Sequence, residues 1–487
     1  MNTFKLKIII MSLKKQLKIF SLCLLSCLAV KVQAQDVNIK IHLLEVYSSK
    51  VSLLPLVGPG AMKPIIEKAG IKNGDVAVLT VPKDKLPGQF VLRFDYQEKQ
   101  SSNPYPSEKY IFIGDQDLEL WVKPKYVNNP DSTFFQKDEK ENSLFVAFGK
   151  ENGKLKGQMG LLQGLLMGYD QPKSRFYQSV IDEYEKRRVD YNKWISSEIQ
   201  KHQDAFVSNS FQFQYVPVSD WKGSETDRMY SLIEHYFDNI NFENSMIIKT
   251  NDLKEWMNSY VNLYGTMSTT VAIRDSLFAL AGHRAIEKAK LGNPLVYGWM
   301  VDYFYKGYEG FNMAVGIKML EPYLNDPRCL TSKRLEIEKR LQGIESIRLG
   351  GIAPDFATKD DIGRPIQFLN YKTKARYKLV FFWSADCQHC KDLVKEMYPW
   401  YLQVGGKKVM EVFALSVDFT DTETKAWEEA KAKLPGWKNF KAKGGINGPD
   451  AAAYFVLATP TMILVDAKTN KIVALPENLE QLQAAMK

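Results

Sequence analysis

The pattern of apolar residues changes twice along the 487 residues of this chain. Apolar and polar residues alternate in short runs over residues 35–135. Apolar residues recur with a helical period over 136–345, and strand-like and helix-like runs alternate over 346–487. A chain of this length exceeds one ordinary hydrophobic core. We therefore predict three folded regions with these boundaries, preceded by a leader at residues 1–34.

Short runs separated by turn residues predict β-strands in the first region. The turn signals include Asn73-Gly74-Asp75 and Leu86-Pro87-Gly88. Alternation in runs this short predicts an antiparallel β-sheet module with one solvated face. The predicted strands are 37–46, 51–56, 76–81, 90–96, 110–113 and 118–122.

The middle region is predicted to be all-α. Its apolar residues recur at helical spacing, and one set falls on a single stripe of one long helix. Such aromatic stripes are more simply explained by core packing than by a ligand groove. The residues of that stripe are Tyr177, Ile181, Tyr184, Tyr191, Ile195 and Ile199.

The last region is predicted to be an α/β domain of about 140 residues. Gly350-Gly351 marks the linker that leads into it, and Thr420 with Glu423 forms a capping box at the start of its second helix. The first helix is expected from Cys387. Strands are expected at 377–383, 409–418, 461–465 and 471–474.

The leader has the order of a secretory signal peptide, with lysines before a largely apolar run at 19–30 and a predicted cleavage after Ala34. Twelve residues are too few for a membrane span of about 20. We therefore predict export to the periplasm or cell envelope. Leu24-Leu25-Ser26-Cys27 leaves an alternative in which Cys27 is a lipid-anchored first residue.

The leader also accounts for most of the formal net charge of +9. Residues 1–34 contain six lysines and no acidic residue, so the remaining chain carries 59 basic and 56 acidic residues, a net charge of +3. A charge this well balanced excludes nucleic acid as an expected partner.

Cysteine usage points to one site. Removal of the leader leaves Cys329, Cys387 and Cys390, too few for a disulfide-stapled scaffold. Cys387 and Cys390 fit the first turn of one helix, close enough to bond. The helix N-terminus should hold the pKa of Cys387 below the free-thiol value of about 8.5, while Cys390 is more buried. Cys387 can therefore attack a disulfide and Cys390 can resolve the mixed disulfide. Cys329 is predicted to be a half-buried thiol at a helix start, and the alternative is a third redox cysteine or an intermolecular link.

Residues from about 345 to 487 resemble the thioredoxin superfamily, specifically its exported TlpA/ResA-type branch. The order and spacing of four motifs carry the resemblance. They are the entry motif Ala353-Pro354-Asp355-Phe356, the central strand Val380-Phe381-Phe382-Trp383, the tetrad Cys387-Gln388-His389-Cys390, and the proline loop Ala458-Thr459-Pro460-Thr461.

The resemblance implies a thiol-disulfide oxidoreductase. Cys387 would be the nucleophile, Cys390 the resolving thiol, and Pro460 a cis residue beside the disulfide, which leaves the Thr459 backbone free to pair with a substrate strand. The implied partners are protein thiols or disulfides, or small thiols, together with an unidentified redox partner. Neither an organic cofactor nor a metal is implied.

Two residues around the tetrad should tune the Cys387 thiolate in opposite directions. Asp386 stands where a tryptophan usually precedes the first cysteine, and its charge would disfavour the thiolate. His389, between the cysteines, would favour it when protonated or by hydrogen bonding.

Three further positions bear on the site. Phe381 occupies the place of a buried carboxylate in thioredoxins, so a proton relay from that position is absent. The proline of the following helix lies at Pro399, one turn later than expected. Trp383 is expected to pack near the site.

Three alternatives were weighed. A structural zinc site requires four ligands, and no second Cys or His pair accompanies this one. A peroxiredoxin-like peroxidase has a similar entry motif and a hydroxyl residue three positions before its cysteine, here Ser384, but Val380 replaces its proline and Cys390 favours disulfide exchange. A redox-inactive envelope binding protein would use the domain for recognition alone, and it need not keep both cysteines.

Overall fold

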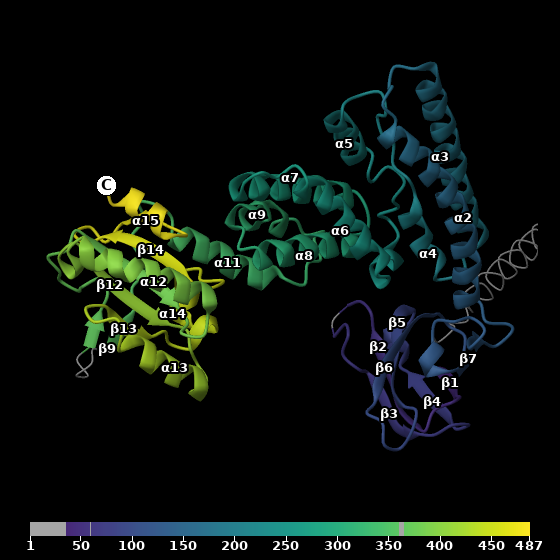
Figure 1. The fold of residues 1–487 in the computed structure, drawn as a ribbon, viewed down its shortest axis with the longest axis horizontal. Coiled ribbons are helices and arrows are strands. Elements are labelled where there is room, and N and C mark those ends of the chain that lie inside the picture. Colours follow the sequence, from purple (N-terminus) through teal and green to yellow (C-terminus); the bar gives the residue numbers. More distant parts are fainter. Residues whose placement is uncertain (1–35, 59, 360–364) are drawn as a thin grey trace, which may run out of the picture. The chain divides into compact units, whose positions relative to one another are not determined.

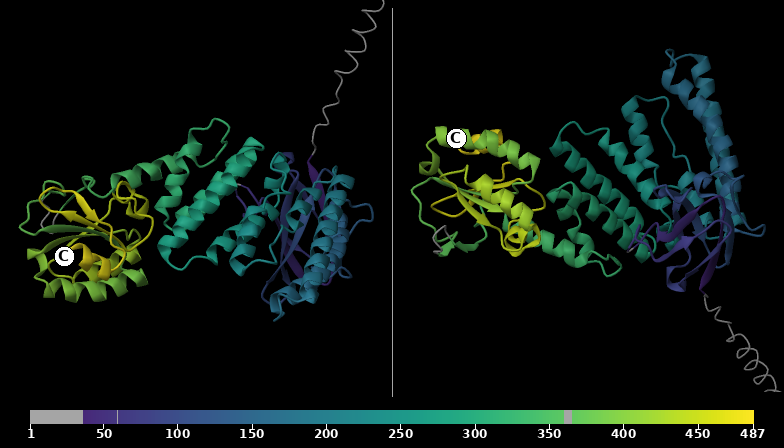
Figure 2. Two further views of the ribbon diagram at one scale, coloured as in Figure 1. Left: turned by 90° about the horizontal axis from the view of Figure 1, so that it is seen from above. Right: turned by 60° about the horizontal axis from the view of Figure 1, so that its bottom comes forward.

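The computed structural model describes residues 36–58, 60–359 and 365–487 (Figure 1, Figure 2). The predicted leader, including Cys27 and the cleavage site after Ala34, lies outside these residues. None of the described helices is both long and apolar enough to cross a membrane.

The chain divides into two compact units. The first ends at Gln214 and also includes Lys249–Asn251, and the second contains Tyr215–Ile248 and Asp252–Lys487. The predicted fold class is confirmed: β-sheets come first, helices follow, and an α/β domain ends the chain.

The first unit contains two four-stranded sheets, ordered β4-β1-β7-β8 and β3-β2-β5-β6. Buried residues of both sheets, such as Ile39 and Leu92, belong to one hydrophobic core, and the second sheet also buries part of its other face, where Val91 and Phe112 lie. The strands are β1 (Val37–Leu43), β2 (Ser48–Pro55), β3 (Ile66–Ile71), β4 (Val76–Val81), β5 (Gly88–Gln97), β6 (Tyr105–Ile113), β7 (Leu118–Val122) and β8 (Thr133–Phe135).

Pairing in these sheets is antiparallel except between β1 and β7, which run parallel. Several strands differ from the sequence-based expectation: β1 ends at Leu43 rather than at residue 46, and β2 begins at Ser48 rather than at residue 51. β3 and β8 were not predicted, because β3 lacks an alternating apolar pattern and β8 is only three residues long. β6 begins at Tyr105, five residues before the predicted start, because its first half is an exposed polar stretch.

The first unit also contains a pair of long helices, α2 (Glu141–Gly168) and α3 (Arg175–Lys201), followed by the short α4 (Ser208–Phe211). The predicted stripe on α3 is confirmed for Tyr177, Ile181, Tyr184, Tyr191 and Ile195, which are buried, whereas its sixth residue, Ile199, is only partly buried. Asn142 joins the start of α2 to the second sheet, since its side chain accepts from the N–H of Phe112 and donates to its carbonyl oxygen, both at 2.9 Å.

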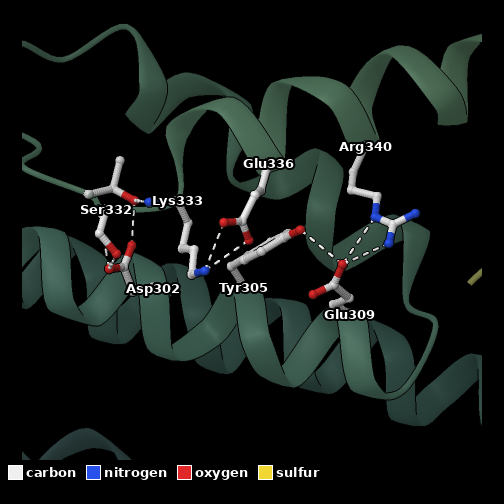
Figure 3. A network of polar contacts seen from close by, with 8 residues as sticks. Asp302, Tyr305, Glu309, Ser332, Lys333, Glu336 and Arg340 are labelled. Atoms are coloured by element: carbon white, nitrogen blue, oxygen red, sulfur yellow. Dashed lines mark hydrogen bonds and ion pairs between the residues drawn. The ribbon is translucent and has the colours of Figure 1, made fainter. Parts of the chain in front are cut away.

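The helices of the second unit precede its α/β domain. They are α5 (Glu225–Glu234), α6 (Asp252–Gly265), α7 (Val271–Lys290), α8 (Pro294–Gly310), α9 (Ala314–Met319), α10 (Glu321–Leu324) and α11 (Arg334–Ser346). Polar contacts join α8 to α11 and the segment before it (Figure 3). Asp302 accepts from the N–H of Ser332 at 3.2 Å and from its hydroxyl at 2.6 Å. Glu309 accepts from the Tyr305 hydroxyl and from Arg340 Nε, both at 3.0 Å.

The α/β domain is built on a five-stranded sheet of order β13-β12-β11-β14-β15, in which β11, β12 and β13 are parallel and β14 and β15 antiparallel. A hairpin of β9 (Ala357–Lys359) and β10 (Pro365–Gln367) precedes it. The sheet strands are β11 (Tyr377–Trp383), β12 (Met410–Ser416), β13 (Lys438–Lys441), β14 (Thr461–Asp466) and β15 (Ile472–Ala474). The helices are α12 (Gln388–Gln403), α13 (Asp421–Lys431), α14 (Pro449–Ala453) and α15 (Leu479–Ala485).

Strand β11 is buried along its whole length, because both faces of the sheet are covered. Phe381 packs with Met397 of α12 on one face, and Phe382 packs with Tyr454, next to α14, on the other. The predicted capping box is confirmed, since Thr420 and Glu423 bond each other's main chain at the start of α13. The central strand ends at Trp383, four positions before Cys387.

Candidate active site

Cys387 lies between the end of β11 and the first turn of α12, where it is the N-cap residue. Its backbone is extended (φ −81°, ψ 121°), and its sulfur accepts a hydrogen bond from the N–H of Cys390 at 3.4 Å. Cys387 is half-buried, whereas Cys390 is 0 % exposed. Both are free thiols in this structure. The helix therefore presents one accessible and one enclosed sulfur, with a single turn between them.

The two thiols have opposite acidities. Burial raises the pKa of Cys387, but hydrogen bonds from Cys390, Thr459 and the main chain of His389 outweigh it, so the pKa lies below the ordinary value. Burial raises the pKa of Cys390 to about 12. Cys387 is thus the sulfur that forms a thiolate more readily, as the attacking member of a redox pair must.

The proline loop brings Thr459 and Pro460 to the cysteines from the far end of the domain's sequence. The peptide bond between Thr459 and Pro460 is cis, which confirms that expectation. The Cys387 thiol donates to the Thr459 carbonyl oxygen at 3.5 Å, and hydrogen bonding by Thr459 lowers the pKa of both thiols. Thr459 therefore contacts Cys387 through its backbone.

Asp386 and His389 are both exposed. The main chain of His389 bonds the Cys387 sulfur, and the tuning roles of the His389 and Asp386 side chains stay predictions. Trp383 is 2 % exposed and belongs to the same core cluster as Cys390, in agreement with a packing role. Helix α12 continues through Pro399 to Gln403.

Sequence reasoning missed a buried carboxylate beside the tetrad. Asp418, two residues after the end of β12, is 4 % exposed. It accepts hydrogen bonds from the hydroxyl of Ser384 at 2.5 Å, the N–H of Ala385 at 3.0 Å and the hydroxyl of Ser416 at 2.8 Å. Phe381 is indeed buried and apolar, so the carboxylate of this site comes from a neighbouring strand. A signal was present, because Ser416 ends a buried parallel strand and Asp418 lies two residues later, at the carboxyl edge where sites of such sheets form.

Residues 349–474 match the family model described as AhpC/TSA family. The C-terminal domain is a thioredoxin-like domain of the AhpC/TSA family. This confirms the resemblance to the thioredoxin superfamily for the C-terminal domain. The match covers the two cysteines and the proline loop and leaves the first unit and the middle helices outside it.

Several solved structures are similar to parts of the chain. A thioredoxin-like protein from Bacteroides caccae is 18% identical, with a TM-score of 0.38, over 56% of this chain and 96% of that chain. The thioredoxin domain of a thiol-disulfide oxidoreductase from Bacteroides vulgatus is 26% identical, with a TM-score of 0.25, over 28% of this chain and 95% of that chain. A domain of a possible thiol-disulfide isomerase from Cytophaga hutchinsonii is 28% identical, with a TM-score of 0.24, over 28% of this chain and 89% of that chain. A search of curated protein sequences found no match.

Proposed function

We propose that this AhpC/TSA-family domain works as a thiol-disulfide oxidoreductase through Cys387 and Cys390. The observation that carries the proposal is the pairing of an accessible thiol of lowered pKa at a helix N-terminus with an enclosed thiol of raised pKa one turn later. A thiolate that forms readily is the attacking group, and a neighbouring thiol can displace what it has captured.

The reaction has two exchange steps. The Cys387 thiolate attacks one sulfur of a substrate disulfide, forming a mixed disulfide and expelling the other substrate sulfur as a thiolate, which takes a proton from solvent. Cys390 then loses its proton and attacks the Cys387 sulfur, which releases the second substrate thiol. The substrate gains two electrons and two protons, and the cysteine pair becomes a disulfide. A redox partner with a dithiol resets the pair, and the reverse sequence oxidises substrates.

We propose that the site faces protein disulfides in the periplasm or cell envelope. The apolar run at 19–30 and the predicted cleavage after Ala34 support export, and Cys27 is the alternative point of lipid attachment. The Thr459 carbonyl already accepts from Cys387, and beside the cis peptide bond to Pro460 it is the group that would pair with a substrate backbone.

Trapping tests the assignment of roles. Cys390→Ser should accumulate mixed disulfides through Cys387, visible on nonreducing gels of envelope extracts, whereas the double variant Cys387→Ser with Cys390→Ser should accumulate none. Reduction of insulin disulfides in the presence of dithiothreitol should require both cysteines. Wild-type protein that neither reduces insulin nor equilibrates with glutathione would overturn the function and leave the redox-inactive binding protein.

A peroxiredoxin-like peroxidase is the second candidate, because the matching family model is AhpC/TSA and Ser384 lies three residues before Cys387. The geometry weighs against it. The Ser384 hydroxyl donates to Asp418 at 2.5 Å and accepts from the N–H of Asp386 at 3.1 Å, so its hydrogen bonds go to these groups. Consumption of hydrogen peroxide that depends on Cys387 but not on Cys390 would favour the peroxidase.

A further inference from the structure

The buried carboxylate of Asp418 is joined to Cys387 through one residue, Ser384. The Ser384 hydroxyl donates to Asp418 Oδ1 at 2.5 Å. The main-chain carbonyl of the same residue accepts from the N–H of Cys387 at 3.3 Å, and the Cys387 sulfur in turn accepts from the N–H of Cys390 at 3.4 Å. Ser384 is therefore the point at which a contact from β12 reaches the redox pair.

We propose that Asp418 is a positioning residue of the redox site, which acts through Ser384 to hold the Cys387 sulfur in line for attack by Cys390. The proposal rests on the thiol-disulfide function proposed above and adds a residue from outside the tetrad to it.

The contacts of Asp418 concentrate on the segment that leads into the tetrad. Its Oδ2 atom accepts from the N–H of Ala385 at 3.0 Å, in addition to the bond from Ser384 to Oδ1. Ser416 donates to the same carboxylate at 2.8 Å and accepts from the Asp418 N–H at 3.1 Å, which fixes the carboxylate relative to β12. Ser384 and Ala385 belong to the segment 384–386 before Cys387, here called the cysteine loop. Both are thus held by hydrogen bonds next to the end of β12.

Burial makes the Asp418 carboxylate depend on its hydrogen bonds with the segment before Cys387. Asp418 is 4 % exposed, and among the described residues no Lys or Arg forms an ion pair with it. A buried carboxylate needs donors, and two of its three come from the loop before Cys387. The carboxylate can therefore keep its hydrogen bonds only while that loop stays in this place.

The same domain offers a matched control. Glu411 lies on the same strand, β12, at its other end, and is 6 % exposed. It also accepts from a hydroxyl, that of Thr373, at 3.0 Å. Substitution of Glu411 removes a buried carboxylate of comparable exposure without touching the cysteine loop.

The test follows the two thiol steps separately in one reaction. Reduced protein beginning at Gln35, with Cys329→Ala in every sample, is mixed with dithiobis(nitrobenzoate). Attack by Cys387 forms a mixed disulfide and releases one nitrobenzoate thiolate. Attack by Cys390 on the Cys387 sulfur then closes the disulfide and releases the second, while the Cys390 proton goes to solvent. The first phase depends on reagent concentration and the second does not.

Asp418→Asn and Ser384→Ala should each slow the second phase by about tenfold or more, because a small misplacement of reacting atoms has large effects on rate. The first phase should change much less. The double variant should be no slower than the slower single variant, since the two residues act as one unit. Ser384→Thr, which keeps the hydroxyl, should restore the rate, and Glu411→Gln should leave both phases unchanged.

Second-phase rates within twofold of the reference in both Asp418→Asn and Ser384→Ala would overturn the positioning role while leaving the proposed function intact. Equal slowing of both phases, or the same slowing in Glu411→Gln, would also overturn it, because general damage to the fold would explain the loss. Absence of a second phase in the reference protein would instead overturn the thiol-disulfide function, and the positioning role with it.

Discussion

Alkylation of the reduced pair should be strongly selective for Cys387. Burial raises the pKa of Cys390 from 9.0 to about 12, and the pKa of Cys387 lies below 9.0. A difference of three in pKa corresponds to a factor of about 1000 in thiolate population at any pH below both values. The more basic thiolate is the better nucleophile, and with a Brønsted coefficient of 0.4 to 0.5 this offsets the advantage by about 15- to 30-fold.

Cys387 should therefore react with iodoacetamide about 30- to 60-fold faster than Cys390 at neutral pH, and burial of the Cys390 sulfur increases the ratio. The assay is limiting iodoacetamide on the reduced wild-type protein, with the two sites separated by peptide mass spectrometry at each time point. Wild-type protein is used because each thiol hydrogen-bonds the other, so replacing one alters its partner.

The pH dependence gives a second readout of the same reasoning. Alkylation of Cys387 should reach half of its maximal rate below pH 9, while alkylation of Cys390 should still rise toward its pKa of about 12. Equal rates at the two sites, or an earlier plateau for Cys390, would refute the assignment of attacking and resolving thiols.

Two further predictions concern stability. Burial raises the pKa of Asp252 to about 6, so the folded chain binds a proton that the unfolded chain releases near pH 4, and stability falls as pH rises through this interval. Asp252→Asn should therefore add up to about 3 kcal/mol at pH 8 and nothing below about pH 4 in urea unfolding; an equal effect at both pH values would contradict this. Gly282→Ala should destabilise by about 1–3 kcal/mol, because its Cβ would lie 1.9 Å from the Tyr308 hydroxyl. Gly307→Ala, on an open helix face, is the control and should raise the free energy of unfolding by a few tenths to about 1 kcal/mol. A Gly282→Ala variant as stable as the wild-type protein would refute the close packing of Gly282 against Tyr308.

Much of the fold followed from periodicity. The buried run Tyr377–Trp383 was predicted as a strand with the bounds that the structure shows, because a strand covered on both faces is apolar throughout. The stripe on α3 and the capping box of Thr420 and Glu423 also depend only on residues close in sequence. Strand β3 was not predicted because most of its residues are exposed, so its sequence shows no alternation of apolar and polar residues.

The candidate site divides in the same way. Local sequence was sufficient to place Cys387 at a helix N-terminus with Cys390 one turn behind it, since a strand, a two-residue spacing and a helix specify that geometry. The contact of Asp418 with Ser384 joins residues 34 positions apart, and no local pattern records such a pairing. It arises because β11 and β12 run parallel in register, with Trp383 opposite Ser416, so the segments after both strands meet at one edge of the sheet. A short local motif therefore determines the position of the two cysteines, whereas the pairing of β11 with β12 in the tertiary structure determines that the Asp418 carboxylate lies beside them.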